Sequence, residues 1–334
     1  MINIGIIGYG YWGPNLVRNF FIQHNCNVKA VVDARPERLK ILTNAYPSIT
    51  ALQSAEDLIN DSTIDAVVIA TPVFTHFDLA KKALQNGKHV MLEKPMTASV
   101  EESNELIALA IEKKLTLMVD HTFLYTGAVK KMKALIDNNE LGKINYFDSS
   151  RLNLGLIQQD VNVLWDLAPH DISILNYLVG YKPIAVQAIG VSHIHNNIEN
   201  IAYLTIKYEE DFIAHFHCSW SSPVKVRTMM IGGDKKMIVF NDNDPSEKLK
   251  IYDTGHNVTT DDERTKLLID YRTGDIFVPK IENIEALSGV AKDFLNAIET
   301  GESPTSDWQS GLNVVKVLEA ADKSIKNKGI EVML

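Results

Sequence analysis

The first 120 or so residues alternate between short apolar, β-branched runs and longer stretches in which apolar residues recur every three or four positions. Runs of the first kind predict strands, and stretches of the second kind predict helices. The predicted strands are residues 3–8, 27–33, 66–71, 89–93 and 115–121, and the predicted helices are residues 14–23, 36–45, 76–86 and 99–113. Strands and helices in alternation indicate an α/β domain with a parallel, doubly wound sheet.

The pattern changes after about residue 122. Helices fit residues 129–138, 169–178 and 310–326, and strand-like segments cluster at residues 144–152, 185–191, 202–208, 213–219, 225–232 and 236–240. Many strands with few helices between them indicate an α+β domain with an open-faced, mainly antiparallel sheet. Residues 253–283 are polar and weakly patterned, which predicts a long loop or arm. We therefore expect two domains, residues 1–122 and 123–334, in line with the length of the chain.

Composition excludes several classes of protein. The formal net charge is −9, from 33 basic and 42 acidic side chains, and no Lys/Arg-rich block occurs, so we expect no nucleic-acid partner. No apolar run approaches the roughly 20 residues of a membrane span, and the N-terminus has no signal-peptide pattern. The two cysteines, Cys26 and Cys218, form no disulfide framework. These features predict a cytoplasmic protein without a membrane partner.

Residues 8–13 read GYGYWG, which matches the G-x-G-x-x-G pattern of dinucleotide-binding proteins. The pattern follows a predicted strand and opens a predicted helix, as the chemistry requires. Gly8 permits the tight turn, Gly10 lets the backbone approach a pyrophosphate, and Gly13 allows close helix–strand packing. Tyr11 and Trp12 lie in the same turn, next to the helix N-terminus that favours a phosphate. This segment predicts a cofactor site.

Asp33 stands twenty positions after Gly13, at the end of the second predicted strand. A carboxylate there can accept hydrogen bonds from the ribose hydroxyls and repels a 2′-phosphate, which favours NAD over NADP. Arg35, two residues further on, weakens this preference. The alternative is a structural turn in which Asp33 only caps a helix.

A second candidate segment is Glu93-Lys94-Pro95, at the end of the strand 89–93. Thr71 and Pro72, with His76 five positions after Thr71, end the preceding strand. Because ligands of α/β sheets gather at the carboxyl ends of the strands, we expect these residues near the cofactor. A lysine there can bind a substrate hydroxyl or move a proton. The alternative is a solvated lysine at the end of a strand.

A third candidate is the pair Asp166 and His170. A carboxylate can hold an imidazole in one tautomer, which makes His170 a candidate general base. Alternatively, Asp166 is a helix N-cap, with Pro169 in the first turn, and His170 is a core histidine. The histidine pairs elsewhere in the chain lack a carboxylate or cysteine at metal-ligand spacing, so we expect no metal.

Taken in order, four patterns resemble the glucose–fructose oxidoreductase/inositol dehydrogenase (Gfo/Idh/MocA) family: G-x-G-x-x-G, T-P-x-x-x-H, G-K-H-V-x-x-E-K-P and D-x-x-x-H. The resemblance implies a Rossmann domain followed by an open-faced sheet that builds homodimers or homotetramers. It implies that Lys94, Asp166 and His170 are catalytic, with Lys94 reaching both nicotinamide and substrate. It also implies a cis peptide at the Lys94–Pro95 bond.

Residues 161–168 (VNVLWDLA) depart from the family, because many members have glycines just before the aspartate and a glycine two residues after it. Together with residues 10–15 (GYWGPN) and 219–227 (SWSSPVKVR), this variant resembles a bacterial subgroup that acts on nucleotide sugars. The resemblance implies an NAD-dependent dehydrogenase that oxidises the C3 hydroxyl of UDP-N-acetylglucosamine or its uronate. Candidate diphosphate contacts are Lys225 and Arg227, and candidate hydroxyl contacts are Tyr125, Arg151 and Asn153. The alternatives are a 3-ketosugar reductase, a cyclitol dehydrogenase and a non-catalytic NAD-dependent sensor.

Overall fold

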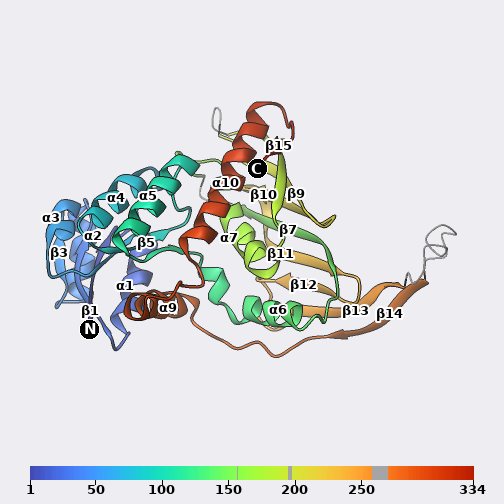
Figure 1. The fold of residues 1–334 in the computed structure, drawn as a ribbon, viewed down its shortest axis with the longest axis horizontal. Helices are drawn as coiled ribbons and strands as arrows, with labels where there is room; N and C mark the ends of the chain where they lie inside the picture. Colours follow the sequence, from blue (N-terminus) through green and yellow to red (C-terminus); the bar gives the residue numbers. More distant parts are fainter. Residues whose placement is uncertain (156, 195–197, 258–269) are drawn as a thin grey trace. The chain divides into compact units, whose positions relative to one another are not determined.

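The computed structural model describes residues 1–155, 157–194, 198–257 and 270–334 (Figure 1). Two compact units make up the chain: Met1–Thr126 with Ile284–Lys316, and Gly127–Asn283 with Val317–Leu334. The first unit thus takes in a C-terminal segment that the sequence pattern groups with the second domain. In the described part of the chain, no helix has the length and apolar character needed to cross a membrane.

The first unit contains a parallel sheet of six strands in the order β3-β2-β1-β4-β5-β6. The strands are β1 (Ile2–Ile7), β2 (Cys26–Val32), β3 (Thr50–Leu52), β4 (Ala66–Ile69), β5 (His89–Glu93) and β6 (Leu117–Asp120). This architecture confirms the predicted doubly wound sheet. Strand order reverses between β1 and β4, and the carboxyl ends of the strands at such a point form the usual ligand crevice.

Five helices connect these strands: α1 (Gly13–Phe21), α2 (Pro36–Ala45), α3 (Ala55–Asn60), α4 (His76–Gln85) and α5 (Val100–Lys113). The first unit also contains α9 (Ala286–Thr300), from the C-terminal part of the chain. α1 lies beside α9, and α4 lies beside α5 (Figure 1). Ser99 caps α5 by accepting the Glu102 N–H, and Ser54 caps α3 in the same way.

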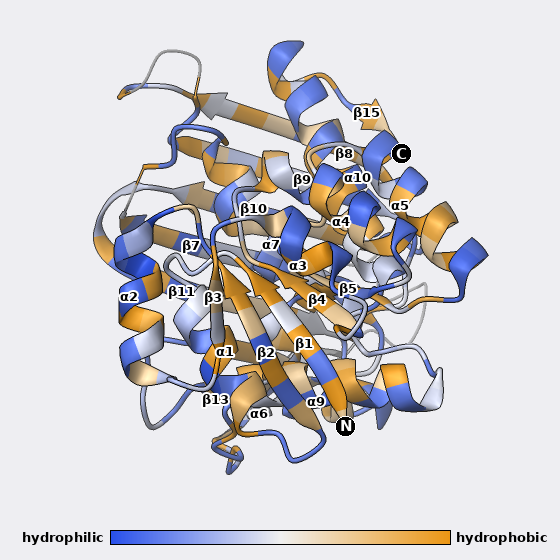
Figure 2. Ribbon diagram, turned by 90° about the vertical axis from the view of Figure 1, so that its left-hand side faces the viewer, coloured by the Kyte–Doolittle hydropathy of each residue, from blue (hydrophilic) through white to orange (hydrophobic). Residues whose placement is uncertain are grey.

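Burial explains why the sheet forms. All four residues of β4 are buried, as are Ile4 and Ile6 of β1, so both faces of the central strands lie in the core. Figure 2 shows β1, β2 and β4 coloured as hydrophobic along much of their length. Central strands of this kind read as continuous apolar runs.

The second unit is built on a sheet of nine strands in the order β14-β13-β12-β11-β7-β10-β9-β8-β15. The strands are β7 (Ile144–Leu154), β8 (Pro183–Val191), β9 (Ile201–Tyr208), β10 (Ile213–Ser219), β11 (Ser221–Gly233), β12 (Met237–Asn241), β13 (Leu249–Asn257), β14 (Asp270–Phe277) and β15 (Val332–Met333). Of the described strands, β7 and β10 pair in parallel and the others are antiparallel. The mainly antiparallel sheet is therefore confirmed.

One face of this sheet carries the helix α7 (Val163–Leu178), which contacts β7, β9 and β10. Along β7 and β10 alternate residues are buried, among them Phe147 and Phe216, whose rings pack 5.6 Å apart. We call this the inner face and the opposite one the outer face. The other α-helices of the described residues are α6 (Gly127–Asp137) and α10 (Trp308–Lys326), and the division between the units falls within α10.

Several segments differ from the sequence prediction, and the short elements β3, α3 and β15 were not predicted either. Residues 253–283, expected to be a loop or arm, contain the end of β13 and the polar edge strand β14. α7 begins at Val163 and not at 169, because Asn162 caps it by accepting the N–H groups of Leu164 and Trp165. α9 was not predicted, although Leu287, Val290, Ala291, Phe294 and Leu295 are buried along it.

Candidate active site

The turn between β1 and α1 has the shape that a pyrophosphate requires. Gly8 has a φ of +102°, and a Cβ there would lie 2.4 Å from the carbonyl oxygen of Ala70. A Cβ at Gly13 would lie 2.4 Å from the carbonyl oxygen of Gly8. A Cβ at Gly10, by contrast, would have the Arg35 Nη2 as its nearest atom, 3.7 Å away. The first and third glycines thus permit close packing, and the middle one leaves the backbone open to a ligand.

α1 begins directly after this turn. Trp12 is its N-cap residue, and Pro14 in the first turn has no N–H to satisfy. The side chains of Tyr11 and Trp12 are 81% and 41% exposed and meet edge to face with ring centroids 5.5 Å apart. The helix N-terminus attracts anions, so these residues fit the diphosphate of NAD.

Asp33 follows β2 and is almost fully engaged by its neighbours. Its Oδ2 accepts the Tyr9 N–H at 2.8 Å and the Arg35 Nη2 at 2.9 Å, and its Oδ1 accepts the backbone N–H and Nε of Arg35 at 2.9 Å each. Burial alone raises the pKa of Asp33, but these hydrogen bonds outweigh it and hold the pKa below its ordinary value. A ribose that uses this carboxylate must therefore displace the Arg35 guanidinium.

Acidic groups meet at the ends of β5 and β6. Glu93 and Asp120 are direct partners across the parallel pair. Burial and the neighbouring Asp120 raise the pKa of Glu93 well above its usual range, although the charge of Lys94 opposes the shift. Burial also raises the pKa of Asp120 to about 6 and, with Lys94, lowers the pKa of His121 to about 3. Lys94 thus stands beside two carboxyl groups and a neutral imidazole.

The turns after β4 and β5 are joined by His76. Its Nδ1 lies 3.0 Å from the Pro95 carbonyl oxygen and its Nε2 lies 2.9 Å from the Thr71 carbonyl oxygen. The Lys94–Pro95 peptide is cis, which confirms the expectation from the family resemblance. Thr71 Oγ1 also bonds Thr75 Oγ1 at 2.6 Å, whereas Pro72 is exposed. Among these predicted cofactor contacts, His76 has both ring nitrogens within hydrogen-bond distance of backbone carbonyl groups of the protein itself.

Asp166 and His170 lie one helical turn apart in α7, so both side chains project from the same side of the helix. Trp220, which follows β10, donates its indole N–H to the Asp166 Oδ2 at 3.0 Å and is 1% exposed. The N-cap of α7 is Asn162, so Asp166 is not the cap that the sequence left open. A carboxylate held in this way can orient a general base on the next turn.

Arg151 and Asp171 form a buried ion pair below α7. The Arg151 Nε lies 3.0 Å from the Asp171 Oδ1, and Nη2 contacts the same carboxylate. Ser149 Oγ donates to Asp171 Oδ2, and the side chains of Arg151 and Asp171 are 5% and 2% exposed. In contrast to the sequence expectation, we therefore assign Arg151 to the support of α7. Tyr125, another expected substrate contact, donates its hydroxyl to Asp293 within the first unit at 2.7 Å.

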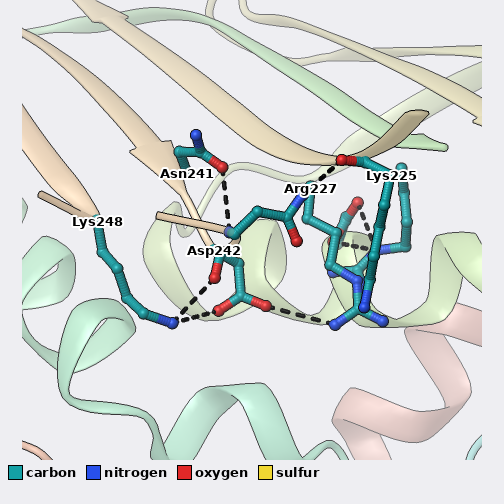
Figure 3. A network of polar contacts seen from close by, with 8 residues as sticks. Lys225, Arg227, Asn241, Asp242 and Lys248 are labelled. Atoms are coloured by element: carbon teal, nitrogen blue, oxygen red, sulfur yellow. Dashed lines mark hydrogen bonds and ion pairs between the residues drawn. The ribbon is translucent and has the colours of Figure 1, made fainter. Parts of the chain in front are cut away.

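A basic cluster lies where β11, β12 and β13 come together. We define it as Lys225, Arg227 and Lys248, together with Asp242. Arg227 Nη1 and Lys248 Nζ approach opposite oxygens of the Asp242 carboxylate, at 3.5 and 2.9 Å (Figure 3). Although burial alone raises the pKa of Asp242, Lys248 and Arg227 hold it below its ordinary value. Arg227 and Lys248 share this one carboxylate, and Lys225 lies two positions from Arg227 on β11, so the cluster keeps positive charge for an anionic ligand.

Asn153 adds an unsatisfied group to the second unit. Its Oδ1 is buried and has no hydrogen-bond partner among the described residues. Because buried polar atoms normally have partners, this oxygen is a candidate ligand contact. Among all residues that the structure describes, no group of three or more His, Cys, Asp or Glu side chains could hold a metal ion.

The predicted residues thus fall into two sets. The glycine-rich turn, Asp33 and Lys94 belong to the first unit, whereas Asp166, His170, Asn153 and the basic cluster belong to the second. The sequence reading missed the roles of Trp220 and Asp120. No sequence pattern marks the indole N–H of Trp220 as a partner of Asp166, and the one signal for Asp120 is its place at the end of an apolar strand.

Comparisons with known proteins match this architecture. Residues 2–121 match the oxidoreductase family GFO_IDH_MocA, NAD-binding Rossmann fold, and residues 129–239 match the GFO/IDH/MocA C-terminal domain. The chain is 26% identical to the UDP-N-acetylglucosamine 3-dehydrogenase of Acidithiobacillus ferrooxidans, over 93% of each chain. It is also 26% identical to scyllo-inositol 2-dehydrogenase (NADP(+)) IolW of Bacillus subtilis, over 98% of this chain and 94% of the relative. The solved structure of the Acidithiobacillus enzyme, GnnA, superposes with a TM-score of 0.80 at 24% identity, covering 98% of both chains.

Proposed function

Because the chain belongs to the Gfo/Idh/MocA family of NAD-binding oxidoreductases, we propose that it oxidises the C3 hydroxyl of a nucleotide-linked sugar. The proposed substrates are UDP-N-acetylglucosamine and its uronate, and the product is the 3-keto sugar. The observation that carries the proposal is that the candidate catalytic pair and the basic cluster occur in the same compact unit. In that unit Trp220 holds Asp166, which lies one helical turn from His170. Similarity to a UDP-N-acetylglucosamine 3-dehydrogenase supports the same substrate class.

The proposed mechanism gives each residue one task. His170 accepts the proton of the sugar hydroxyl, and Asp166 stabilises the imidazolium that forms. Lys94 holds the oxygen as negative charge develops on it. Bound NAD supplies the acceptor for the hydride that leaves the carbon. The turn formed by Gly8, Gly10 and Gly13 would hold the diphosphate of the cofactor, and Asp33 would hold its ribose in place of the Arg35 guanidinium.

The basic cluster gives the proposal its nucleotide-sugar part. A diphosphate carries negative charge and strong acceptor oxygens, and a planar guanidinium with ammonium groups binds it well. Arg227 is 34% exposed at its side chain and Lys225 is exposed, so both are accessible to a ligand. A free sugar or cyclitol would make no use of these cations.

The experiment incubates purified protein with NAD and a panel of UDP-sugars, with myo-inositol and glucose as controls, and follows NADH absorbance. We expect turnover with UDP-N-acetylglucosamine or its uronate, and loss of roughly a hundredfold or more in kcat in His170→Ala. Lys225→Ala and Arg227→Ala should raise KM for the UDP-sugar. Lys250→Ala is the control and should not, because Lys250 lies on β13 outside the basic cluster and its ammonium pairs with Glu247.

Two outcomes would redirect the proposal. Turnover of inositol but not of UDP-sugars would make the chain a cyclitol dehydrogenase. If no NADH appears, the panel is repeated with 2-oxoglutarate as acceptor, because an enzyme that retains its cofactor turns over only when that cofactor is reoxidised. Failure there too, with NAD still bound, would favour a sensor.

We also propose that the chain forms homodimers or homotetramers through the outer face of its second sheet. Exposed apolar side chains occur at alternate positions of that face, including Ile189, Tyr203, Met230 and Ile276. Exposed apolar patches of this kind mark protein interfaces. Light scattering after gel filtration should give a mass above that of one chain, and Met230→Lys should lower it. A monomer at micromolar concentration would contradict this.

A further inference from the structure

His76 is the first residue of α4 and lies against the two turns that follow β4 and β5. Its side chain is 1% exposed, so the ring is enclosed by protein. One ring nitrogen is within hydrogen-bond distance of Pro95 O, and the other of Thr71 O. The imidazole therefore joins the turn that carries Lys94 to the turn of the neighbouring strand.

Both partners of the ring are carbonyl oxygens, which can only accept. A neutral imidazole has one N–H and donates to one of them, and only the cation can donate to both. Burial lowers the pKa of His76, opposed by the carbonyl groups around it, and no charged side chain of the described residues contributes to the shift. The interaction is therefore made with backbone and not with an acidic partner.

The Thr71 turn is a firm support for this contact. The Thr71 hydroxyl bonds that of Thr75 at 2.6 Å, and Thr75 Oγ1 donates to the carbonyl oxygen of Pro72 at 2.7 Å. The Thr75 N–H donates to the same carbonyl at 2.9 Å. A turn closed by three hydrogen bonds leaves little freedom to whatever is attached to it.

We propose that His76 is a positioning residue for Lys94, holding the Lys94–Pro95 backbone against the Thr71 turn. The inference rests on the proposed function through the role of Lys94. A lysine ammonium sits on a four-carbon chain that starts at the backbone, so a shift of the Lys94 backbone moves the ammonium with it. A displacement of about 1 Å at a reacting group can cost about a hundredfold in rate. In this proposal His76 does not touch the substrate and acts through the backbone of Lys94 and Pro95.

The test compares His76→Leu and His76→Gln with the matched control His89→Leu. His89 begins β5, at the opposite end of the strand from Lys94, and its Nδ1 accepts the Thr116 N–H at 3.0 Å. We expect His76→Leu to lower kcat roughly tenfold to a hundredfold while KM for the sugar and Kd for NAD change less than about threefold. Glutamine, which can still donate to one carbonyl, should recover part of the loss. His89→Leu should keep the wild-type kcat.

A second readout needs no substrate. Hydrogen exchange measured by mass spectrometry should become faster in peptides covering residues 69–76 and 93–98 of His76→Leu, and not in the rest of the first unit. This result would support the inference even if no sugar in the panel is oxidised, so the two proposals fail separately. Unchanged exchange in both peptides, wild-type kcat in His76→Leu, or an equal loss of kcat in His89→Leu would overturn it.

Discussion

Replacing Asp120 with asparagine should stabilise the protein at neutral pH, although the side chain is buried and hydrogen-bonded. Burial raises the pKa of Asp120 to about 6, against the lowering effects of Thr122 and Lys94. In the unfolded chain an aspartate has a pKa of about 3.9. The folded state therefore binds the proton more tightly between about pH 4 and pH 6, and stability falls as the pH rises through that range.

The expected magnitude follows from the difference of about two pKa units. One unit corresponds to about 1.4 kcal/mol, so the charged carboxylate costs the folded state about 3 kcal/mol at neutral pH. Asparagine carries no charge and retains an oxygen that can accept the Thr122 hydroxyl, which donates to Asp120 at 2.7 Å. It also removes a neighbouring charge that raises the pKa of Glu93.

The assay is thermal unfolding of Asp120→Asn and the wild type at about pH 4, 6 and 8. The two proteins should have similar Tm values at the lowest pH, and the variant should gain roughly 2–4 °C per kcal/mol at the highest. Asp137→Asn, at an exposed carboxylate paired with Lys133, is the control and should show no such trend. A Tm difference between Asp120→Asn and wild type that is the same at every pH would refute the reasoning.

The remaining predictions concern the ion pair, the turn and the ribose site. Arg151→Met should lower the free energy of unfolding by about 3–5 kcal/mol in urea titrations, because it leaves Asp171 buried and unpaired, and adding Asp171→Leu should recover much of the loss. Gly13→Ala should weaken NAD binding at least tenfold by calorimetry, because its methyl group would lie 2.4 Å from a carbonyl oxygen, whereas Gly180→Ala, with no atom within 4 Å, should bind normally. Arg35→Ala should tighten NAD binding, since the guanidinium no longer occupies the ribose carboxylate, and should weaken binding of NADP; equal changes for both cofactors would contradict this.

Apolar patterning predicted the elements whose two faces lie in the core. β4 reads AVVI and is buried throughout, as expected for a short β-branched run in the centre of a parallel sheet. β14 reads DYRTGDIF and lies at the edge of its sheet, paired only with β13 among the described strands. Such a strand is held by its backbone pairing and needs little apolar surface. Its sequence therefore lacks the regular alternation of apolar and polar residues from which a strand is predicted.

Residue spacing predicted the catalytic candidates but not their partners. Asp166 and His170 are four positions apart, which places them on one side of any helix. Trp220, which donates its N–H to Asp166, is 54 positions away. From residue type alone, an indole ring is expected to contribute to packing. Likewise, the sequence around Arg151 gives no sign of its ion pair with Asp171 in α7. Polar partners of this kind are set by strand register and helix packing, which single-residue patterns do not encode.

Asp166 and Lys94, two of the three candidate catalytic residues, each have a positioning contact in the structure. Trp220 donates an N–H to Asp166 without adding charge, and His76 holds the backbone next to Lys94 through its contacts with two carbonyl oxygens. An oppositely charged partner would also fix the geometry, but it would reduce the charge available to the substrate and shift the pKa of the reacting group. Arg151 and Asp171 show the alternative, since their pairing stabilises the fold beneath α7 and leaves neither charge for chemistry. A neutral positioning group such as Trp220 thus separates the task of holding a residue in place from the task of setting its charge.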